Sequence, residues 1–259
     1  VPHGDQITLR HLANHRSGLF NHIESREVKD RFAAEPERLW TEQELLSFSL
    51  KAPPYFAPGE QHHYSNANTV LLARAIEKTT GRGWAVEVRD RILKPLELQH
   101  TLIPSDNALP DPHAEGYALG TSEGPFFHRG DKLINVTRTS PTWWGPAGSM
   151  ISTLDDLHRA APALARGDLL SPAMRVELHR WTTADQSGFE YGFHIERVRG
   201  AIGHDGDVPG YQTVMLYFPE LDATVVALTN LYGWSVRGMP ADRLAWLAAE
   251  EYLGVPRKP

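Results

Sequence analysis

"HHYSNAN", residues 62–68, is the stretch from which the fold of this chain is best worked out. It precedes the apolar run "TVLLARAIEKTTG". Asparagine and serine are favoured at helix starts because their side chains accept hydrogen bonds from free backbone N–H groups. The pattern predicts a helix from Asn66 to about Thr80, with Gly81 as its left-handed cap. A tyrosine beside the capping residues also favours a second interpretation, a functional site.

Helical signals dominate the first half of the chain. "TEQELLSFSLKA" begins with Thr41 and has Glu44 three residues on, which is the reciprocal capping pattern. Thr8 can begin a short helix in "TLRHLA" in the same way. Further along, Ser152 or Thr153 is expected to cap a helix that starts in "LDDLHRAAPALARG".

The C-terminal part changes to strand patterns. "YGFHIERV", "AIGHDG", "TVMLYFP" and "ATVVALTN" are strand-like, with turns at 199–200 and 219–222. Two consecutive hairpins predict an antiparallel sheet, and "PADRLAWLAAEEYLG" predicts a final amphipathic helix. The expected fold class is therefore α+β. We expect one domain over 1–259, mainly helical at 1–150, with a helix, antiparallel strands and the final helix at 151–259.

Composition excludes several classes of function. The 259 residues have a net charge of -6 and contain no cluster of lysine and arginine, so a nucleic-acid partner is not expected. The apolar runs are too short to span a bilayer. The absence of cysteine excludes thiol catalysis and cysteine-ligated metals, and the histidines lack helical zinc spacing, so no metal site is predicted.

Three features are candidates for chemistry. The first is "YSN", residues 64–66, at the predicted helix start. The second is "GHDGDVPGY", residues 203–211, at a strand, and the third is the glycine-rich bend "WWGPAGS", residues 143–149. Taken singly, each has a structural explanation: helix capping, turn formation and packed apolar surface. Their order along the chain favours the functional interpretation.

In this order the features resemble the serine β-lactamase and penicillin-binding protein superfamily, and most of all its D-alanyl-D-alanine carboxypeptidases and class C β-lactamase-like members. "YSN" matches the family's Tyr-x-Asn motif, and "HDG", residues 204–206, matches the histidine form of its third motif. "LRHLANHRSGL" and "PAGSMISTLDDL" also resemble family segments. The resemblance implies a β-lactamase/transpeptidase-like fold: an antiparallel sheet flanked by helices, an all-helical region, and a site in the cleft between them.

The resemblance also implies catalytic roles. Tyr64 would shuttle a proton, which goes to the leaving group. Asn66 would hydrogen-bond the lysine of the nucleophile motif and the substrate amide, while Ser65 caps the helix. His204 would bind a substrate carboxylate or orient Tyr64.

Three further residues would bind substrate on this resemblance. Gly206 would let the substrate approach the strand backbone, Asp207 would supply one backbone N–H of the oxyanion hole, and Trp143 would stack on the substrate from the opposite wall. The acidic Asp205 departs from the Thr or Ser of many relatives. Together with Asp207 it weakens the case for a carboxypeptidase and favours esters, D-amino-acid amides or peptidyl thioesters.

The family's nucleophile motif, Ser-x-x-Lys, does not occur in the 259 residues. Ser47 and Ser49 precede Lys51 at the wrong spacings. By resemblance the motif is expected upstream of Val1, together with the first strands of the sheet. The competing interpretation is a family member that has lost its nucleophile. We therefore expect this chain alone to be inactive and to expose an open strand edge, and either to fold poorly or to have the missing N-terminal segment as a partner.

The resulting prediction is a serine hydrolase or acyltransferase that acts on D-alanyl-D-alanine-type peptides or β-lactams through an acyl-serine intermediate. The alternatives on the same fold are an esterase, a D-aminopeptidase or a peptide cyclase, or a non-catalytic protein that binds peptidoglycan-like or β-lactam ligands. The expected partner is a small-molecule or peptide substrate, with no metal or organic cofactor. The resemblance favours an exported location, extracellular or periplasmic.

Overall fold

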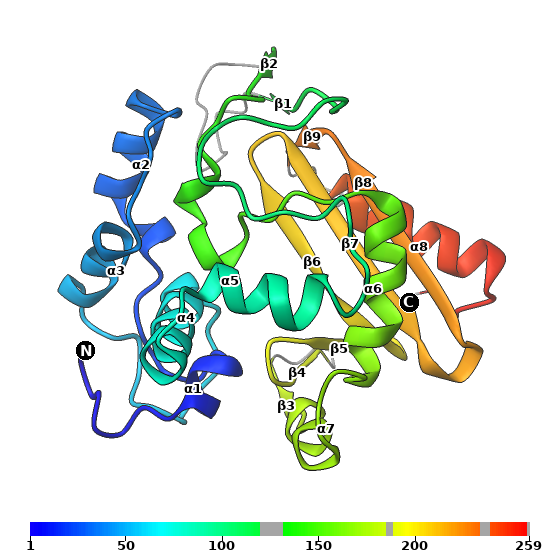
Figure 1. Cartoon of the computed structure of the whole chain (residues 1–259), viewed down its shortest axis with the longest axis horizontal. Coiled ribbons are helices and arrows are strands. Elements are labelled where there is room, and N and C mark those ends of the chain that lie inside the picture. The colour runs from blue at the N-terminus through cyan, green and yellow to red at the C-terminus, as the bar shows by residue number, and fades with distance from the viewer. Residues whose placement is uncertain (120–131, 185–188, 234–238, 258–259) are drawn as a thin grey trace.

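The computed structural model of the chain describes residues 1–119, 132–184, 189–233 and 239–257. A helical region lies beside an antiparallel sheet, which has further helices on its faces (Figure 1). The α-helices are α1 (Leu9–Ala13), α2 (Arg26–Ala34), α3 (Glu42–Lys51), α4 (Asn66–Thr80), α5 (Trp84–Val88), α6 (Leu154–Arg166), α7 (Pro172–Leu178) and α8 (Pro240–Tyr252). The shorter helical turns are η1 (His22–Glu24), η2 (Arg89–Leu93), η3 (Pro141–Trp143), η4 (Gly145–Ala147) and η5 (Pro219–Leu221). The strands are β1 (Tyr117–Leu119), β2 (Leu133–Asn135), β3 (Thr182–Thr183), β4 (Glu190–Tyr191), β5 (Glu196–Val198), β6 (Ala201–Val208), β7 (Tyr211–Phe218), β8 (Ala223–Thr229) and β9 (Leu231–Tyr232).

Helix α4 begins and ends where the sequence predicts, and Gly81 closes it with φ 71°. Ser65 occupies the N-cap position, but its hydroxyl donates to the carbonyl of Phe20 (3.3 Å) and makes no capping bond. The predicted cap is therefore wrong in its chemistry. Asn21, from the loop after α1, accepts a hydrogen bond from the first N–H of the helix (3.2 Å).

The other predicted helix caps are formed by hydrogen bonds between residues close together in the sequence. Thr8 caps α1, and Thr41 with Glu44 forms a complete capping box at α3. Of the two candidates for α6, Thr153 is the one whose side chain accepts the backbone N–H of Asp156. These helix starts depend on residues only three positions apart, so sequence alone is sufficient to find them.

The predicted hairpins are confirmed. Within the described ranges, β3-β4-β5-β6-β7-β8 form one sheet in which every neighbouring pair is antiparallel. Helix α8 packs on one face of this sheet and α6 packs on β6, β7 and β8. Small side chains on α8 allow close approach to the apolar residues of β7; the contacting set is Ala241, Ala245, Ala249, Val214, Leu216 and Phe218. The α+β class is therefore correct.

A smaller sheet links the two halves of the chain. β1 pairs antiparallel with β2 and parallel with β9, so residues 117–119 lie beside residues 231–232. These strands are two or three residues long, too short for an alternating pattern to reveal them. No helix in the described part of the chain is long and apolar enough to cross a membrane.

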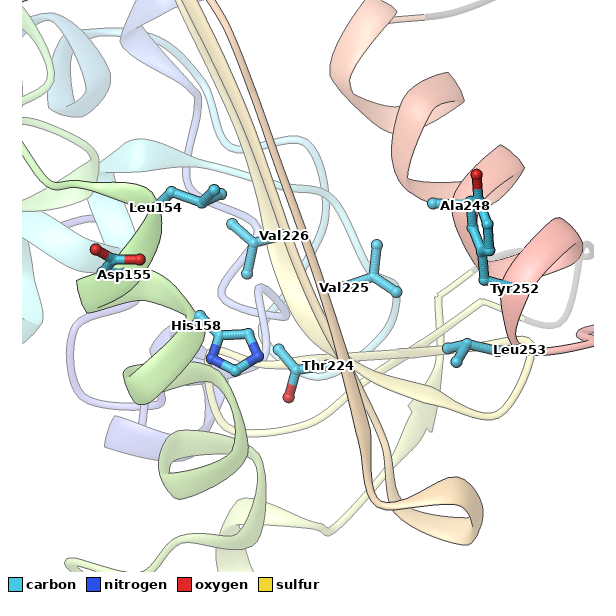
Figure 2. A pocket seen from close by; sticks show the side chains of 9 residues that line it. All are labelled: Leu154, Asp155, His158, Thr224, Val225, Val226, Ala248, Tyr252 and Leu253. Carbon is cyan, nitrogen blue, oxygen red and sulfur yellow. The ribbon is translucent and has the colours of Figure 1, made fainter.

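Strand β8 is an outer strand of the large sheet, and no described segment pairs with its far edge. A groove runs along it between α6 and α8 (Figure 2). Leu154 and His158 line it from α6, Thr224 and Val226 from β8, and Ala248 and Tyr252 from α8. The unpaired N–H and C=O groups of such an edge are a template for another strand. The expected open edge is present among the described residues.

We predict that this edge makes the isolated chain self-associate. A lysine in place of Thr224 puts a charge at the edge and disfavours strand pairing. Sedimentation velocity over a concentration series should show association weakened about tenfold, roughly 1.4 kcal/mol. Thr79→Lys adds the same charge on α4 and serves as the control. Equal association of Thr224→Lys and the unchanged chain would contradict the prediction.

Candidate active site

His15 holds the "YSN" segment in place from the loop after α1. Its ring is fully buried, and Nδ1 accepts hydrogen bonds from the backbone N–H of Ser65 (3.2 Å) and from the Asn68 amide (3.0 Å). The ring also stacks on Tyr64, with centroids 4.0 Å apart. Burial, with nearby His194, His62 and His204, lowers the pKa of His15. The ring is therefore neutral, as an acceptor of two N–H groups must be.

Tyr64 is positioned between His15 and the strand that contains His204. Its ring centroid lies 6.4 Å from that of His204 and 6.5 Å from that of Tyr191. Burial raises the pKa of Tyr64, and the carboxylates of Glu196 and Asp205 raise it further. In this surrounding the phenol keeps its proton near neutral pH. It can therefore donate a proton, as the sequence-based role requires.

Asn66 is the first residue of α4 and is 3% exposed. Its backbone N–H donates to Asn21, as described above. Its side-chain amide makes no hydrogen bond to another described residue. The amide is thus available to a ligand or to a residue outside the described ranges, which agrees with the role expected for it. That role stays a prediction.

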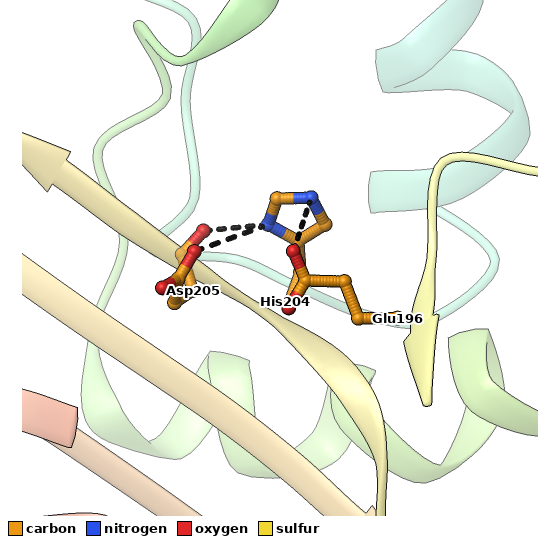
Figure 3. Close-up of side chains that lie close together, drawn as sticks. All are labelled: Glu196, His204 and Asp205. Atoms are coloured by element: carbon orange, nitrogen blue, oxygen red, sulfur yellow. Dashed lines mark hydrogen bonds and ion pairs between the residues drawn. The ribbon is translucent and has the colours of Figure 1, made fainter. Parts of the chain in front are cut away.

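His204 on β6 has an oxygen at each ring nitrogen (Figure 3). Nε2 lies 2.7 Å from the Tyr191 hydroxyl and 3.5 Å from Glu196 Oε1. Nδ1 lies 2.6 Å from the Asp205 carbonyl oxygen and 3.8 Å from Oδ1 of the same residue. Burial alone would lower the pKa of His204, but Glu196, Asp205 and that carbonyl outweigh it and raise the pKa. The ring therefore favours the charged state.

Glu196, His204 and Asp205 also have ligand atoms within 4.8 Å of one another, which is close enough to consider a metal ion. The two carboxylates stand at opposite nitrogens of the ring. A single ion binds only one of these nitrogens, whereas a protonated ring pairs with both carboxylates. The donor geometry thus fits an imidazolium better than a metal centre.

Strand β6 is paired on both sides only at its beginning. β5 pairs with residues 201–203, whereas β7 pairs with residues 202–208. Residues 204–208 therefore have one backbone edge that no described strand covers. This edge contains Gly206 and Asp207, the two residues expected to meet the substrate backbone. The oxyanion role of the Asp207 N–H stays a prediction, and its carboxylate accepts a hydrogen bond from Gln212 Nε2 (2.9 Å).

Trp143 does not have the role that the sequence suggested. Its side chain is fully buried, with its ring centroid 4.5 Å from Phe32 and 5.1 Å from Trp40. A side chain with no exposed surface presents no ring face to a substrate. The expectation that Trp143 stacks on the substrate is therefore wrong for this arrangement. Trp143 belongs to the aromatic core under α2 and α3.

Sequence reasoning missed Tyr191 and Glu196. The hairpin between β4 and β5 places them directly opposite each other, and Glu196 in turn lies opposite Gly203 of β6. His194, with φ 55°, lies in the turn that sets this register. The string "YGFHIE" gives the turn no strong signal, because it has neither an Asn-Gly nor an Asp-Gly pair. Without the register, the carboxylate cannot be placed beside His204.

The chain belongs to the Beta-lactamase family, which matches residues 1–250. The α+β fold and the ordered "YSN" and "HDG" segments agree with this membership. The chain is 28% identical over 240 residues to penicillin-binding protein 4* of Bacillus subtilis, covering 86% of this chain and 51% of the relative. It thus spans about half the length of the curated relatives it matches.

Two solved structures are similar over most of the chain. A D-stereospecific amidohydrolase from Streptomyces sp. superimposes with a TM-score of 0.84 at 27% identity, covering 98% of this chain and 74% of that one. The D-amino acid amidase from Ochrobactrum anthropi SV3, complexed with D-phenylalanine, gives a TM-score of 0.77 at 25% identity, covering 89% and 67%. The predicted β-lactamase-like fold is therefore confirmed.

We predict that replacing a glycine of β6 by alanine destabilises the protein at Gly203 but not at Gly206. A Cβ on Gly203 would lie 1.9 Å from the Met215 carbonyl oxygen, whereas a Cβ on Gly206 would meet only Thr213 Cβ, at 3.8 Å. Gly203→Ala should lower the free energy of unfolding by about 3 kcal/mol, at the upper end of overpacking costs. Gly206→Ala should unfold like the unchanged chain in urea. Equal losses in the two variants would refute the strand geometry.

Proposed function

We propose that the protein containing this chain is a serine hydrolase that cleaves D-amino-acyl amides or esters through an acyl-serine intermediate. The observation that supports this most is the charge around His204. The ring, whose pKa is raised, lies beside Glu196 and Asp205, and Asp207 is two residues further along β6. Burial raises the pKa of Glu196 to about 7, so Asp205 and Asp207 supply most of the negative charge. A free substrate carboxylate would therefore meet net negative charge. An amide or ester at the same bond carries no such charge.

Family resemblance and relatives support the same class. One similar structure is named a D-stereospecific amidohydrolase and another a D-amino acid amidase. A curated relative that is 26% identical is named teichoic acid D-alanine hydrolase. These names describe cleavage next to a D-configured residue. An exported location is part of this proposal and rests on the resemblance.

The chemistry assigns each residue a step. A serine hydroxyl, expected from a Ser-x-x-Lys segment outside these 259 residues, passes its proton to the lysine of that segment and attacks the carbonyl carbon. Tyr64 gives a proton to the leaving nitrogen or oxygen as the bond to carbon breaks. Water then attacks the acyl-serine: one proton of the water returns to Tyr64, and the lysine returns its proton to the serine oxygen as the D-amino acid is released. Asn66 and the free edge of β6 hold the substrate for both steps.

A carboxypeptidase acting on D-alanyl-D-alanine-type peptides, or a β-lactam-binding enzyme, is the second candidate. The charged state of His204 favours it, because an imidazolium can pair with a substrate carboxylate. The relative named penicillin-binding protein 4* points the same way. Asp205 separates the candidates, since it would repel the carboxylate of a peptide and leave an amide unaffected.

The decisive experiment compares substrates on the parent protein that includes the upstream segment. We predict that kcat/KM for a D-amino acid amide exceeds that for a D-alanyl-D-alanine peptide by at least about tenfold, roughly 1.4 kcal/mol. Asp205→Thr should shift that ratio toward the peptide by about tenfold, because it removes the repelling charge. Tyr64→Phe should slow both substrates by about 100-fold or more.

Labelling the parent protein with a fluorescent penicillin tests the acyl-serine step separately. A labelled serine upstream of Val1 supports the proposed nucleophile. A parent protein without a Ser-x-x-Lys segment would rule out this mechanism. A preference for the free-acid peptide that persists in Asp205→Thr and in the unchanged protein would replace the amide proposal by the carboxypeptidase.

A further inference from the structure

The two carboxyl groups beside His204 favour a protonated ring. The carbonyl oxygen of Asp205 can only accept, so Nδ1 must donate to it. At Nε2 there are two oxygens, the Tyr191 hydroxyl and the Glu196 carboxylate. A neutral ring can accept a hydrogen bond from the Tyr191 hydroxyl at Nε2, but it has no charge to pair with the Glu196 carboxylate 3.5 Å away. A protonated ring donates on both sides.

The charged groups around His204 and Glu196 come from two strands and one helix. Glu196 on β5 and Asp205 on β6 are the two carboxylates beside the ring, and Asp242 on α8 adds negative charge near Glu196. Burial raises the pKa of Glu196, and Asp205 and Asp242 add to this while His204 opposes it. The other titratable groups near His204 are the phenols Tyr64 and Tyr191 and the imidazoles His15 and His194. Burial raises the pKa of the two phenols and lowers the pKa of the two imidazoles, so all four favour the neutral form.

Tyr191 makes this arrangement rigid. Its side chain is fully buried, and its ring packs against those of His15 (5.0 Å between centroids) and His204 (5.8 Å). Its hydroxyl can therefore approach Nε2 from one direction only. The side chain of Glu196 is 16% exposed and that of His204 is 26% exposed. Both groups are thus held where water screens their attraction only partly.

We propose that Glu196 and Tyr191 are positioning residues for His204: they fix the plane of its ring and keep it an imidazolium beside Tyr64. The part of this role that concerns catalysis rests on the proposed function. There the cation offsets the negative charge that develops on the Tyr64 oxygen as its proton leaves. Neither residue belongs to the "YSN" or "HDG" segment, so Glu196 and Tyr191 are additions to the site residues that these two motifs indicate.

The titration of His204 tests the proposal without any substrate. Long-range proton–nitrogen NMR spectra of the parent protein report the charge of each histidine ring, and His204→Gln assigns the signal. Removing the Glu196 charge with Glu196→Gln should lower the pKa of His204 by about 1 unit or more. Glu190→Gln is the matched control, because Glu190 lies on the neighbouring strand and pairs with Arg197 (2.6 Å).

A second variant keeps the test usable if Glu196→Gln does not fold. In the proposed charged state Nε2 donates to the Tyr191 hydroxyl, so Tyr191→Phe should also lower the pKa of His204, by roughly 0.5–1 unit. The proposal is overturned if the His204 titration in Glu196→Gln, or in Tyr191→Phe where only that variant folds, matches that of Glu190→Gln. It is also overturned if one equivalent of Zn²⁺ shifts the His204 signal in the unchanged parent protein, because the trio would then be a metal site.

Activity of the parent protein separates positioning from a purely structural role. Glu196→Gln should move the alkaline limb of the kcat/KM profile to lower pH, since His204 would lose its proton earlier. In a His204→Lys background the ammonium stays charged without help, so Glu196→Gln should leave the profile in place. A shift of equal size in both backgrounds contradicts the proposal. If no substrate is turned over, the proposed function fails while the NMR titration still decides this inference.

Discussion

The acceptor nitrogen of His15 is the constraint on which the site depends. It binds the backbone N–H of Ser65 and the side chain of Asn68, so the loop after α1 is fixed to the start of α4. The same ring stacks on Tyr64. One buried neutral histidine thereby sets both the entry of the helix and the plane of the phenol. Burial makes protonation costly, and a proton on Nδ1 would break both hydrogen bonds.

The opposite wall of the site is governed by charge. His204 lies between two carboxyl groups that raise its pKa, and its own strand has a backbone edge beside it that no described strand covers. The ring of Tyr64 stacks on the neutral His15, and its centroid lies 6.4 Å from that of His204. One neighbour of the phenol is therefore neutral, and the other has a raised pKa. This asymmetry suits a group that passes a proton in one direction.

Local patterns in the sequence predicted the parts of the fold that depend on neighbouring residues. The span of α4, the capping box at Thr41 and the C-terminal hairpins were all recoverable from spacing within a few positions. Trp143 was misjudged because its burial depends on Phe32 and Trp40, more than 100 residues away in the chain. A tryptophan in a glycine-rich bend looks the same whether it lines a site or fills a core. Glu196 was missed for a related reason, since its place is set by strand register.

Hydrogen exchange in a His15→Phe variant tests the central claim most directly. Phenylalanine keeps an aromatic ring on Tyr64 but has no acceptor for the Ser65 N–H. We predict that the Ser65 amide is protected in the unchanged chain and loses about tenfold or more of that protection in the variant, while the amide of Val214 in the sheet is unaffected. Retention of full protection at Ser65 in a folded His15→Phe chain would show that the site does not depend on this bond.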